Sequence, residues 1–369
     1  MSNRGRGGPL SPARPLADLV SLTAELIDVA SVSGGEAPLV ERLEAALRDA
    51  PWLRLDRVGD NLVARTELGA AQRVILAGHT DTVPPNGNER ARIEGDCVWG
   101  LGAADMKGGL AVMLELARTV SQPALDVTYV FYAREEVASV HSGLAELARL
   151  RPELLRGDVA FLGEPTGGGL EAGCQGTLRL EVTLAGVRAH TARPWMGRNA
   201  VHRLAPILSA VAAYEPRRPV LDGCEFREAL QAVAVRGGVA GNVVPDSAGL
   251  TLNFRFAPDR SAAEAEAHVR RLLAPHLEAG DEAELTDVAR AAPPALTHPA
   301  IARVQRRGNL AVTAKLGWTD VARFADLGVP AVNFGPGEST LAHAPDERVT
   351  RSQLDGVYAA LHELLVGGC

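Results

Sequence analysis

The chain has 369 residues, 46% of them hydrophobic, and a formal net charge of −7 at pH 7. This length exceeds the size at which one hydrophobic core keeps growing, so we expect two domains. The acidic balance argues against a general nucleic-acid binder, which needs a basic face to neutralise phosphates. No apolar run approaches the roughly 18 residues that indicate a membrane span.

The cysteines and the N-terminal segment indicate the compartment. The cysteines are far apart and form no Cys-x-x-Cys pair, so neither a zinc ribbon nor a disulfide framework is expected. Residues 1–15 carry three arginines among Gly, Pro and Ser, but they lack the apolar core of a secretory signal. We expect a loose N-terminal arm and a cytoplasmic protein.

The first half of the chain alternates between helical and extended patterns. Apolar residues recur at helical spacing in two leading segments, with a Gly-Gly pair between them. Apolar strands and a further helix follow. This alternation predicts an α/β fold with a mixed sheet. The predicted helices cover 16–30, 36–50 and 107–120, and the predicted strands cover 73–77, 127–132 and 159–162.

From Thr177 onward the pattern changes to β-α-β-β-α-β, the ferredoxin-like arrangement. Such a unit closes on itself, so we expect 177–290 to be an inserted domain and 16–176 with 291–369 to form the other domain. The predicted strands are 178–184, 230–236, 248–256 and 283–288, and the predicted helices are 199–213 and 262–273. A helix and the strand 331–334 then return the chain to the first domain.

Candidate metal ligands directly follow three of the predicted strands. His79 follows the first, the pair Glu135-Glu136 the second and Glu164 the third. Because the carboxyl ends of strands in open α/β sheets gather ligands at one edge, we expect these side chains to lie close together. Adjacent residues of an extended chain point in opposite directions, so one of the two glutamates can bind an ion while the other acts as a base.

Two further positions complete the candidate set: Asp105 in Ala-Asp-Met-Lys-Gly-Gly and His343 in Ala-His-Ala-Pro. Two imidazoles and several carboxylates, without thiolate, favour Zn²⁺, Co²⁺ or Mn²⁺ and suit a pair of ions that Asp105 can bridge. Asp81 can accept a hydrogen bond from the ring nitrogen of His79 that does not bind metal. Each motif alone is more often a surface pair, a helix start or a turn; their order and their places at strand ends favour the metal site.

The chain resembles the dinuclear zinc aminoacylase and carboxypeptidase family, which includes acetylornithine deacetylase and succinyl-diaminopimelate desuccinylase. The resemblance covers nearly the whole chain after the N-terminal arm. It is greatest to the succinyl-diaminopimelate desuccinylase branch in four stretches: Glu-Ala-Gly-Cys-Gln-Gly-Thr at 171–177, Gly-Gly-Val-Ala-Gly-Asn-Val-Val-Pro-Asp at 237–246, Gly-Trp-Thr-Asp-Val-Ala-Arg-Phe at 317–324 and Asn-Phe-Gly-Pro-Gly at 333–337.

This resemblance implies roles for individual residues. Glu135 is the general base and Asp81 orients His79. His190 resembles a lid histidine that, in dimeric members, reaches into the site of the partner subunit and stabilises the developing oxyanion. The inserted domain is then both lid and homodimer interface. One zinc is expected on His79, Asp105 and Glu164, and the other on Asp105, Glu136 and His343.

The substrate carboxylates require cationic or amide donors, of which guanidinium is the best suited. This chain departs from some relatives, which carry Arg in place of Gln175 and Tyr in place of Arg193. The candidate substrate contacts are Thr177, Arg193, Asn242, Arg255, Gly335 and Gly337.

The activity that the resemblance implies is removal of the succinyl group from N-succinyl-LL-2,6-diaminopimelate, which releases succinate and the diamino acid for lysine biosynthesis. The alternatives are an acetylornithine or acetylcitrulline deacetylase, a dipeptidase, and an inactive binding protein with the same fold. A general base and a complete ligand set argue against the last, because a binder needs no base.

Overall fold

The computed structural model describes residues 18–368, so the predicted N-terminal arm lies outside the described residues. The described chain forms two compact units. The first contains 18–157, Gly163–Gly168 and 335–368, and the second contains Asp158–Leu162 and Gly169–Phe334. Both units contain mixed sheets with helices, as expected for the α/β class. The predicted bounds of an inserted domain stay a prediction.

The sheet of the first unit has the strand order β1-β2-β6-β3. Strand β2 is antiparallel to both neighbours, whereas β3 is parallel to β6. All of β6, and all of β3 except Arg73, is buried, which accounts for the continuous apolar runs in the sequence. The strands are β1 (Arg54–Val58), β2 (Asn61–Arg65), β3 (Arg73–His79) and β6 (Asp126–Tyr132).

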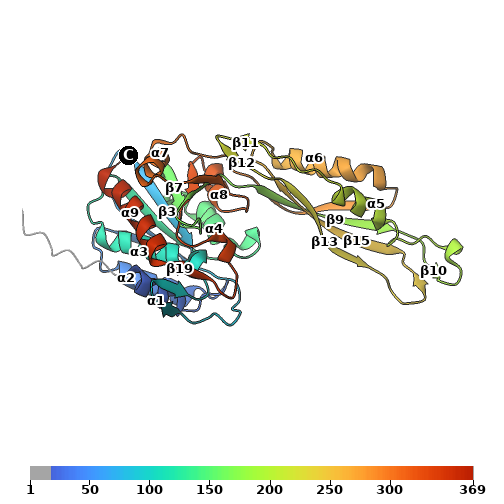
Figure 1. Cartoon of the computed structure of the whole chain (residues 1–369), viewed down its shortest axis with the longest axis horizontal. Coiled ribbons are helices and arrows are strands. Elements are labelled where there is room, and N and C mark those ends of the chain that lie inside the picture. Colours follow the sequence, from blue (N-terminus) through green and yellow to red (C-terminus); the bar gives the residue numbers. More distant parts are fainter. Residues whose placement is uncertain (1–17, 369) are drawn as a thin grey trace, which may run out of the picture. The chain divides into compact units, whose positions relative to one another are not determined.

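Helices pack against this sheet, and α3 contacts both α1 and α9 (Figure 1). The predictions for α1, α2 and α3 are confirmed within a few residues. The sequence analysis missed α4 and α9, although α9 begins with a capping box formed by Thr350 and Gln353. The helices are α1 (Leu19–Ile27), α2 (Ala37–Leu47), α3 (Gly108–Thr119), α4 (Gly143–Leu150) and α9 (Arg351–Gly367). A small antiparallel sheet contains β4 (Arg92–Glu94), β5 (Cys97–Trp99) and β19 (Arg348–Thr350).

In the second unit, four short strands follow the order β7-β18-β8-β17. Strand β18 is parallel to β7 and antiparallel to β8, and β8 is parallel to β17. The elements here are β7 (Val159–Leu162), β8 (Leu170–Ala172), β17 (Val312–Ala314), β18 (Ala331–Asn333), α7 (Pro299–Gly308) and α8 (Val321–Asp326).

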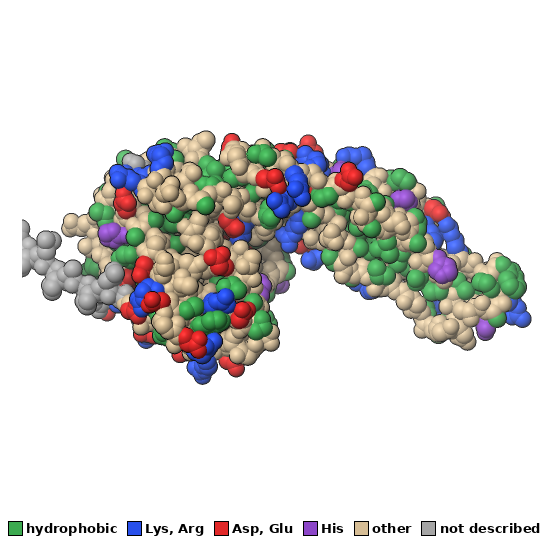
Figure 2. Space-filling view, in the orientation of Figure 1, with side chains coloured by type: hydrophobic (Ala, Val, Ile, Leu, Met, Phe, Trp, Pro, Cys, Tyr) green, Lys and Arg blue, Asp and Glu red, His purple; other side chains and the backbone are tan. Residues whose placement is uncertain are grey.

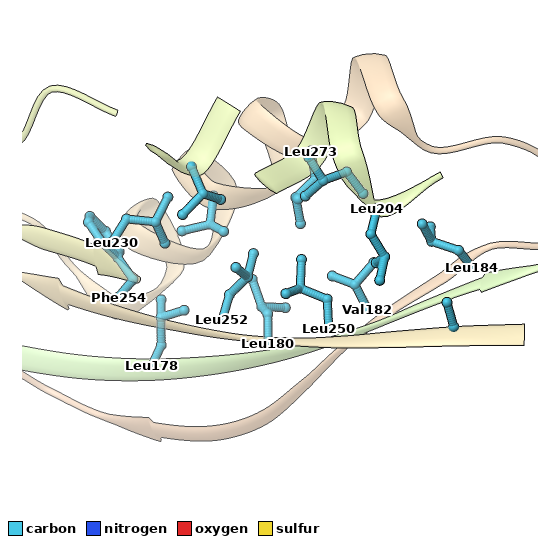
Figure 3. Close-up of a cluster of buried hydrophobic side chains, with 14 of the residues drawn as sticks. Leu178, Leu180, Val182, Leu184, Leu204, Leu230, Leu250, Leu252, Phe254 and Leu273 are labelled. Atoms are coloured by element: carbon cyan, nitrogen blue, oxygen red, sulfur yellow. The ribbon is translucent and has the colours of Figure 1, made fainter. Parts of the chain in front are cut away.

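The remaining part of the second unit is a four-stranded antiparallel sheet with the order β13-β15-β9-β16. Alternate residues of β9 are buried, and Leu178, Leu180 and Val182 point with their neighbours toward α5 and α6 (Figure 3). The sheet therefore buries one face under two helices. The elements are β9 (Gly176–Ala185), β13 (Ala229–Gly237), β15 (Ser247–Phe256), β16 (Glu282–Ala289), α5 (Leu204–Ala212) and α6 (Ala262–Leu273).

Helix α5 starts five residues later than predicted. The side chain of Asn199 accepts the backbone N–H groups of Val201 and His202, which holds this segment in a turn. A polar side chain that bonds to nearby backbone competes with helix formation. Short pairs complete the unit: β10 (Ala189–His190) with β14 (Val243–Val244), and β11 (Val220–Leu221) with β12 (Cys224–Glu225).

Exposed hydrophobic side chains gather near β10 in the second unit (Figure 2). Trp195 is 77% exposed and Met196 is 66% exposed. Within residues 18–368, no helix combines the length and the apolar character needed to cross a bilayer.

Candidate metal centre

The candidate ligands of the first unit lie where strands end. His79 is the last residue of β3, and Glu135 and Glu136 follow the end of the parallel neighbour β6. Glu164 follows β7, and the preceding residue Gly163 donates its N–H to the carbonyl of Ala77 in β3 at 2.9 Å. The strand-end argument therefore predicted correctly that residues distant in sequence meet here.

Asp105 lies between the two histidines. His79 Nε2 is 2.9 Å from Asp105 Oδ1, and His343 Nε2 is 3.8 Å from Asp105 Oδ2. His343 Nε2 is also 2.8 Å from Glu136 Oε1. The two oxygens of one carboxylate thus face different imidazoles, which is the geometry that a bridging ligand requires.

The ligand atoms form three overlapping groups, and within each group all atoms lie within 4.8 Å of one another. Two of these groups coincide with the sets implied by the family resemblance, and Asp105 belongs to both. The third group shows that Glu135 also lies within reach of His79. The groups are His79 with Asp105 and Glu164, Asp105 with Glu136 and His343, and His79 with Glu135 and Glu136.

Negative charge dominates the surroundings of both imidazoles. Burial alone lowers the pKa of His79, but Asp105 and Asp81 beside the ring raise that pKa well above its usual value. The hydrogen bond to Glu136 raises the pKa of His343 to about 8. Both rings therefore lie where positive charge is stabilised, which is the electrostatic condition for binding a cation.

The donor set fits divalent metal ions. Two imidazoles and three carboxylates form two overlapping triads without a thiol, a nitrogen and oxygen donor set that borderline ions such as Zn²⁺ accept. His79 is 1% exposed and Glu164 is 4% exposed, so these donors are held away from bulk water. Such a cluster of carboxylates is costly to bury without a compensating cation.

Asp81 contacts the backbone of the Glu135-Glu136 pair. Its two carboxylate oxygens accept the N–H groups of Glu135 at 2.9 Å and Glu136 at 3.0 Å, and Ser33 donates its hydroxyl at 2.7 Å. His79 Nδ1 lies 3.0 Å from the carbonyl oxygen of Asp81 and 3.6 Å from its carboxylate. Burial raises the pKa of Asp81, but His79 and these donors outweigh it and lower that pKa. Asp81 thus holds both glutamates in addition to contacting His79.

Two buried glutamates that the sequence analysis missed support the ligand loops. Glu36 accepts the N–H of Arg134 at 3.1 Å, directly before the Glu135-Glu136 pair. Glu347 accepts N–H groups in the loop that carries Asp105. Their partners are 98 and 242 residues away in sequence. No local pattern could therefore have identified them.

The two predicted glycine contacts have packing reasons for being glycine. A Cβ at Gly335 would lie 2.2 Å from the carbonyl oxygen of Gly163, next to the ligand Glu164. Gly337 has φ +82°, and a Cβ there would lie 2.7 Å from the Cα of Ala104. Both positions let the chain approach the ligand segments closely. Contact with substrate at these glycines stays a prediction.

The other predicted site residues belong to the second unit, where they form two groups. His190 accepts the N–H of Ala192 on its Nδ1, Arg193 donates its N–H to the His190 carbonyl, and Thr191 donates to the carbonyl of Asn242. His190, Arg193 and Asn242 are all exposed. The structure thus brings these three together at the β10–β14 pair.

Thr177 and Arg255 form the second group, because they are opposite each other in the β9–β15 register. Asn253 donates its side-chain amide to the Thr177 hydroxyl at 3.2 Å, so these side chains share the face that α5 and α6 leave open. Burial and the nearby guanidinium of Arg179 lower the pKa of Arg255. Asp287 acts in the opposite direction, but among residues 18–368 no carboxylate forms an ion pair with Arg255.

Comparison with known proteins identifies the class. Residues 75–366 match the model of the peptidase family M20/M25/M40. This match covers well over half of the chain, and the chain belongs to this family. The resemblance inferred from the motifs is therefore confirmed.

Individual relatives are similar in sequence over nearly the whole chain. The chain is 49% identical over 351 residues to a Mycobacterium tuberculosis protein assigned as succinyl-diaminopimelate desuccinylase DapE, with 95% of this chain and 98% of the relative covered. It is 44% identical over 356 residues to a Corynebacterium glutamicum succinyl-diaminopimelate desuccinylase, with 95% and 96% covered.

Among solved structures, a Staphylococcus aureus tripeptidase superposes with a TM-score of 0.77 at 21% sequence identity. The superposition covers 94% of this chain and 97% of the tripeptidase. At this identity the likeness shows the fold alone, a mixed α/β fold shared with this enzyme.

Proposed function

We propose that the protein is a metal-dependent hydrolase that converts N-succinyl-LL-2,6-diaminopimelate to succinate and LL-2,6-diaminopimelate in lysine biosynthesis. The observation that carries this is the identity of 49% and 44%, over 95% of the chain, to two proteins named for this activity. The grouped imidazoles and carboxylates supply the ligand atoms that a metal-dependent hydrolase needs.

The proposed cofactor is a pair of zinc ions, for which Co²⁺ or Mn²⁺ can substitute. When bound, such ions polarise a carbonyl and make water more acidic. Support comes from the two groups that share Asp105. The assignment is His79, Asp105 and Glu164 for one ion, and Asp105, Glu136 and His343 for the other.

Glu135 is the proposed general base. Its carboxylate takes the proton of the attacking water and later returns it to the departing nitrogen. Asp81 fixes the backbone on which Glu135 and Glu136 lie, and Glu136 contacts His343. We therefore assign the neighbouring glutamates different roles: Glu136 as a ligand beside His343, and Glu135, which lies within reach of His79, as the proton acceptor.

The proposed substrate contacts come from the second unit, except Gly335 and Gly337 of the first. Within residues 18–368 the half-buried guanidinium of Arg255 forms no ion pair, and it is suited to a substrate carboxylate. Thr177 and Asn253 offer neutral donors on the same face. The full proposed set is Thr177, Arg193, Asn242, Arg255, Gly335 and Gly337, with His190 stabilising the oxyanion.

We also propose that 177–290 is a ferredoxin-like inserted domain, flanked by 16–176 and 291–369, and that it serves as lid and homodimer interface. The order β13-β15-β9-β16 supports the ferredoxin-like assignment. Val233 and Val235 on the edge strand β13 are 57% and 53% exposed, as suits a surface covered in a dimer. We place the enzyme in the cytoplasm, where free thiols such as the described Cys97, Cys174 and Cys224 stay reduced.

A substrate panel tests the activity. The purified protein should hydrolyse N-succinyl-LL-2,6-diaminopimelate in preference to N-acetylornithine, N-acetylcitrulline and dipeptides. Chelation should abolish turnover, and added Zn²⁺ or Co²⁺ should restore it. Preference for an acetylated substrate would reassign the acyl group, and no turnover of any substrate would favour a binding protein.

Sedimentation velocity tests the dimer. Val235→Arg should shift the wild-type dimer toward monomer, because a charge on a buried edge is costly. The matched control is Val140→Arg in the first unit, where Val140 is 84% exposed and the change should have no effect. A wild-type monomer, or a dimer insensitive to Val235→Arg, would contradict the proposed interface.

A further inference from the structure

Glu347 is a buried carboxylate that lies outside the grouped ligands but contacts the loop that carries one of them. It is 1% exposed. Its Oε2 accepts the N–H of Gly102 at 3.0 Å, and its Oε1 accepts the N–H groups of Ala104 at 3.0 Å and Asp105 at 2.9 Å. One side chain thus binds three backbone donors within four residues.

The loop needs these acceptors because its backbone departs from a regular helix. Gly102 has φ +78°, and Asp105 has φ −121° and ψ 90°. Helix α3 begins only at Gly108. Buried N–H groups outside a regular ladder require another partner, and a carboxylate can accept from all of them at once.

Glu347 also connects this loop to the second histidine, since it lies four residues after His343. Its carbonyl accepts the N–H of Gly100 at 3.0 Å, and its own N–H donates to Ala344 at 3.1 Å. The segments carrying Asp105 and His343 are therefore joined through both the backbone and the side chain of one residue. Within residues 18–368 the Glu347 carboxylate has no ion-pair partner, so its hydrogen bonds go to backbone alone.

We propose that Glu347 is a positioning residue that sets Asp105 against His343, so that the two oxygens of Asp105 can serve two ions. It does this by accepting backbone hydrogen bonds, without binding metal or substrate itself. The inference rests on the proposed pair of ions. Glu36 and Asp81 accept backbone N–H groups of 134–136 in the same manner. Buried carboxylates therefore support two of the loops that carry ligands.

Glu347→Gln in the full chain is the primary test variant. The amide keeps the size of the side chain but turns one acceptor into a donor that faces an N–H group. Asp126→Asn is the matched control. Asp126 is also a buried carboxylate of the first unit, 4% exposed, and it accepts the N–H groups of Leu68 and Ala70, but it lies at the start of β6, away from the ligands.

The measurement is ion binding to chelator-treated protein, by calorimetric titration with Zn²⁺ and by the visible absorption of added Co²⁺. For Glu347→Gln we expect at least one ion to bind about 10–100-fold more weakly, as is typical when a group supporting a ligand is lost. The Co²⁺ spectrum should change, and kcat should fall more than KM rises. Asp126→Asn should lose stability but bind both ions as the wild type does.

Two wild-type-like ions and an unchanged Co²⁺ spectrum in Glu347→Gln would overturn the proposal. If that variant does not fold, ion binding to Glu347→Asp is measured instead. This variant keeps a carboxylate, which only accepts hydrogen bonds, but its side chain is one carbon shorter. Weaker ion binding than in Asp126→Asn supports positioning, and equal binding overturns it. A wild type that binds no pair of ions would instead refute the proposed function, so the two failures are distinguishable.

Discussion

Strands β3 and β6 of the first unit differ from β9 and β15 of the second in what their two faces contact. The former are buried on both faces, and the candidate ligands lie only where these strands end. The latter alternate, with one face in a hydrophobic core and the other carrying Thr177, Asn253 and Arg255. A strand buried on both faces can display chemistry only at its ends, whereas a one-sided sheet can display it along its length.

The loops differ correspondingly. The strand-end loops of the first unit are held by buried carboxylates that accept backbone N–H groups, as Asp81 does for Glu135 and Glu136. The β10–β14 region of the second unit is exposed and is joined by backbone hydrogen bonds, such as that from Thr191 to Asn242. We therefore expect substitutions near the ligands to alter chemistry, and substitutions in the hydrophobic core of the four-stranded sheet to alter stability.

The largest expected effect is on catalysis. Glu135→Gln should lower kcat by about 10²–10⁴-fold, because it removes the proposed proton acceptor. Metal analysis should still find two ions bound. The neighbouring variant Glu136→Gln should instead reduce the bound metal. Loss of an ion from Glu135→Gln would show that this residue is a ligand, as its proximity to His79 permits.

The next effect concerns the core of the second unit. Leu180→Ala should lower the free energy of unfolding by roughly 2–5 kcal/mol, because it leaves a cavity among fully buried side chains. Urea denaturation measures this change. Thr183→Ala, at an exposed position of the same strand, should cost only about 0.5 kcal/mol or less. Weakened ion binding in Leu180→Ala would contradict the separation of stability from chemistry.

A smaller effect is expected at the Asp281–Arg203 ion pair. Arg203 donates to both oxygens of Asp281, whose side chain is fully buried. These hydrogen bonds outweigh burial and lower the pKa of Asp281 from 3.8 to about 2. Asp281→Asn should therefore lower the free energy of unfolding by roughly 1–3 kcal/mol at neutral pH.

The pH dependence of that difference has a definite sign. Because the folded-state pKa is depressed, the stabilisation is complete above about pH 4 and is lost as the pH falls toward 2. Denaturation of the wild type and Asp281→Asn across this range should show their stabilities converging in acid. A difference that is constant down to pH 2 would mean that the carboxylate charge contributes nothing.

The smallest effects should be the same in both units. Thr350 and Ser261 each form a capping box, at α9 in the first unit and α6 in the second. Replacing either by Ala should cost about 1 kcal/mol, because one backbone N–H loses its acceptor. Thermal unfolding of the two variants provides the comparison. A much larger effect at one cap would show that the tertiary environment, and not the local motif, sets its contribution.

The sequence predicted every described strand of at least seven residues, and it predicted that His79, Glu136 and Glu164 meet at strand ends. It did so because buried strands leave continuous or alternating apolar runs, and strand ends are marked by the polar residue that follows. It did not predict β1, β2, β8, β17, the small β4-β5-β19 sheet or the two-residue strand pairs, because runs of two to five residues carry too little pattern. The sequence also revealed the family, because the ligand motifs occur along the chain in the order that resembles this family.

Local sequence thus determined the ligand types, their order and the helix caps, since propensity, spacing and side-chain chemistry are properties of neighbouring residues. Tertiary structure alone decided which oxygen of Asp105 faces which histidine, and it brought Glu36 and Glu347 to the ligand loops. These contacts join residues 98 and 242 positions apart. Only the folded backbone, with its buried N–H groups in need of acceptors, gives those carboxylates their role.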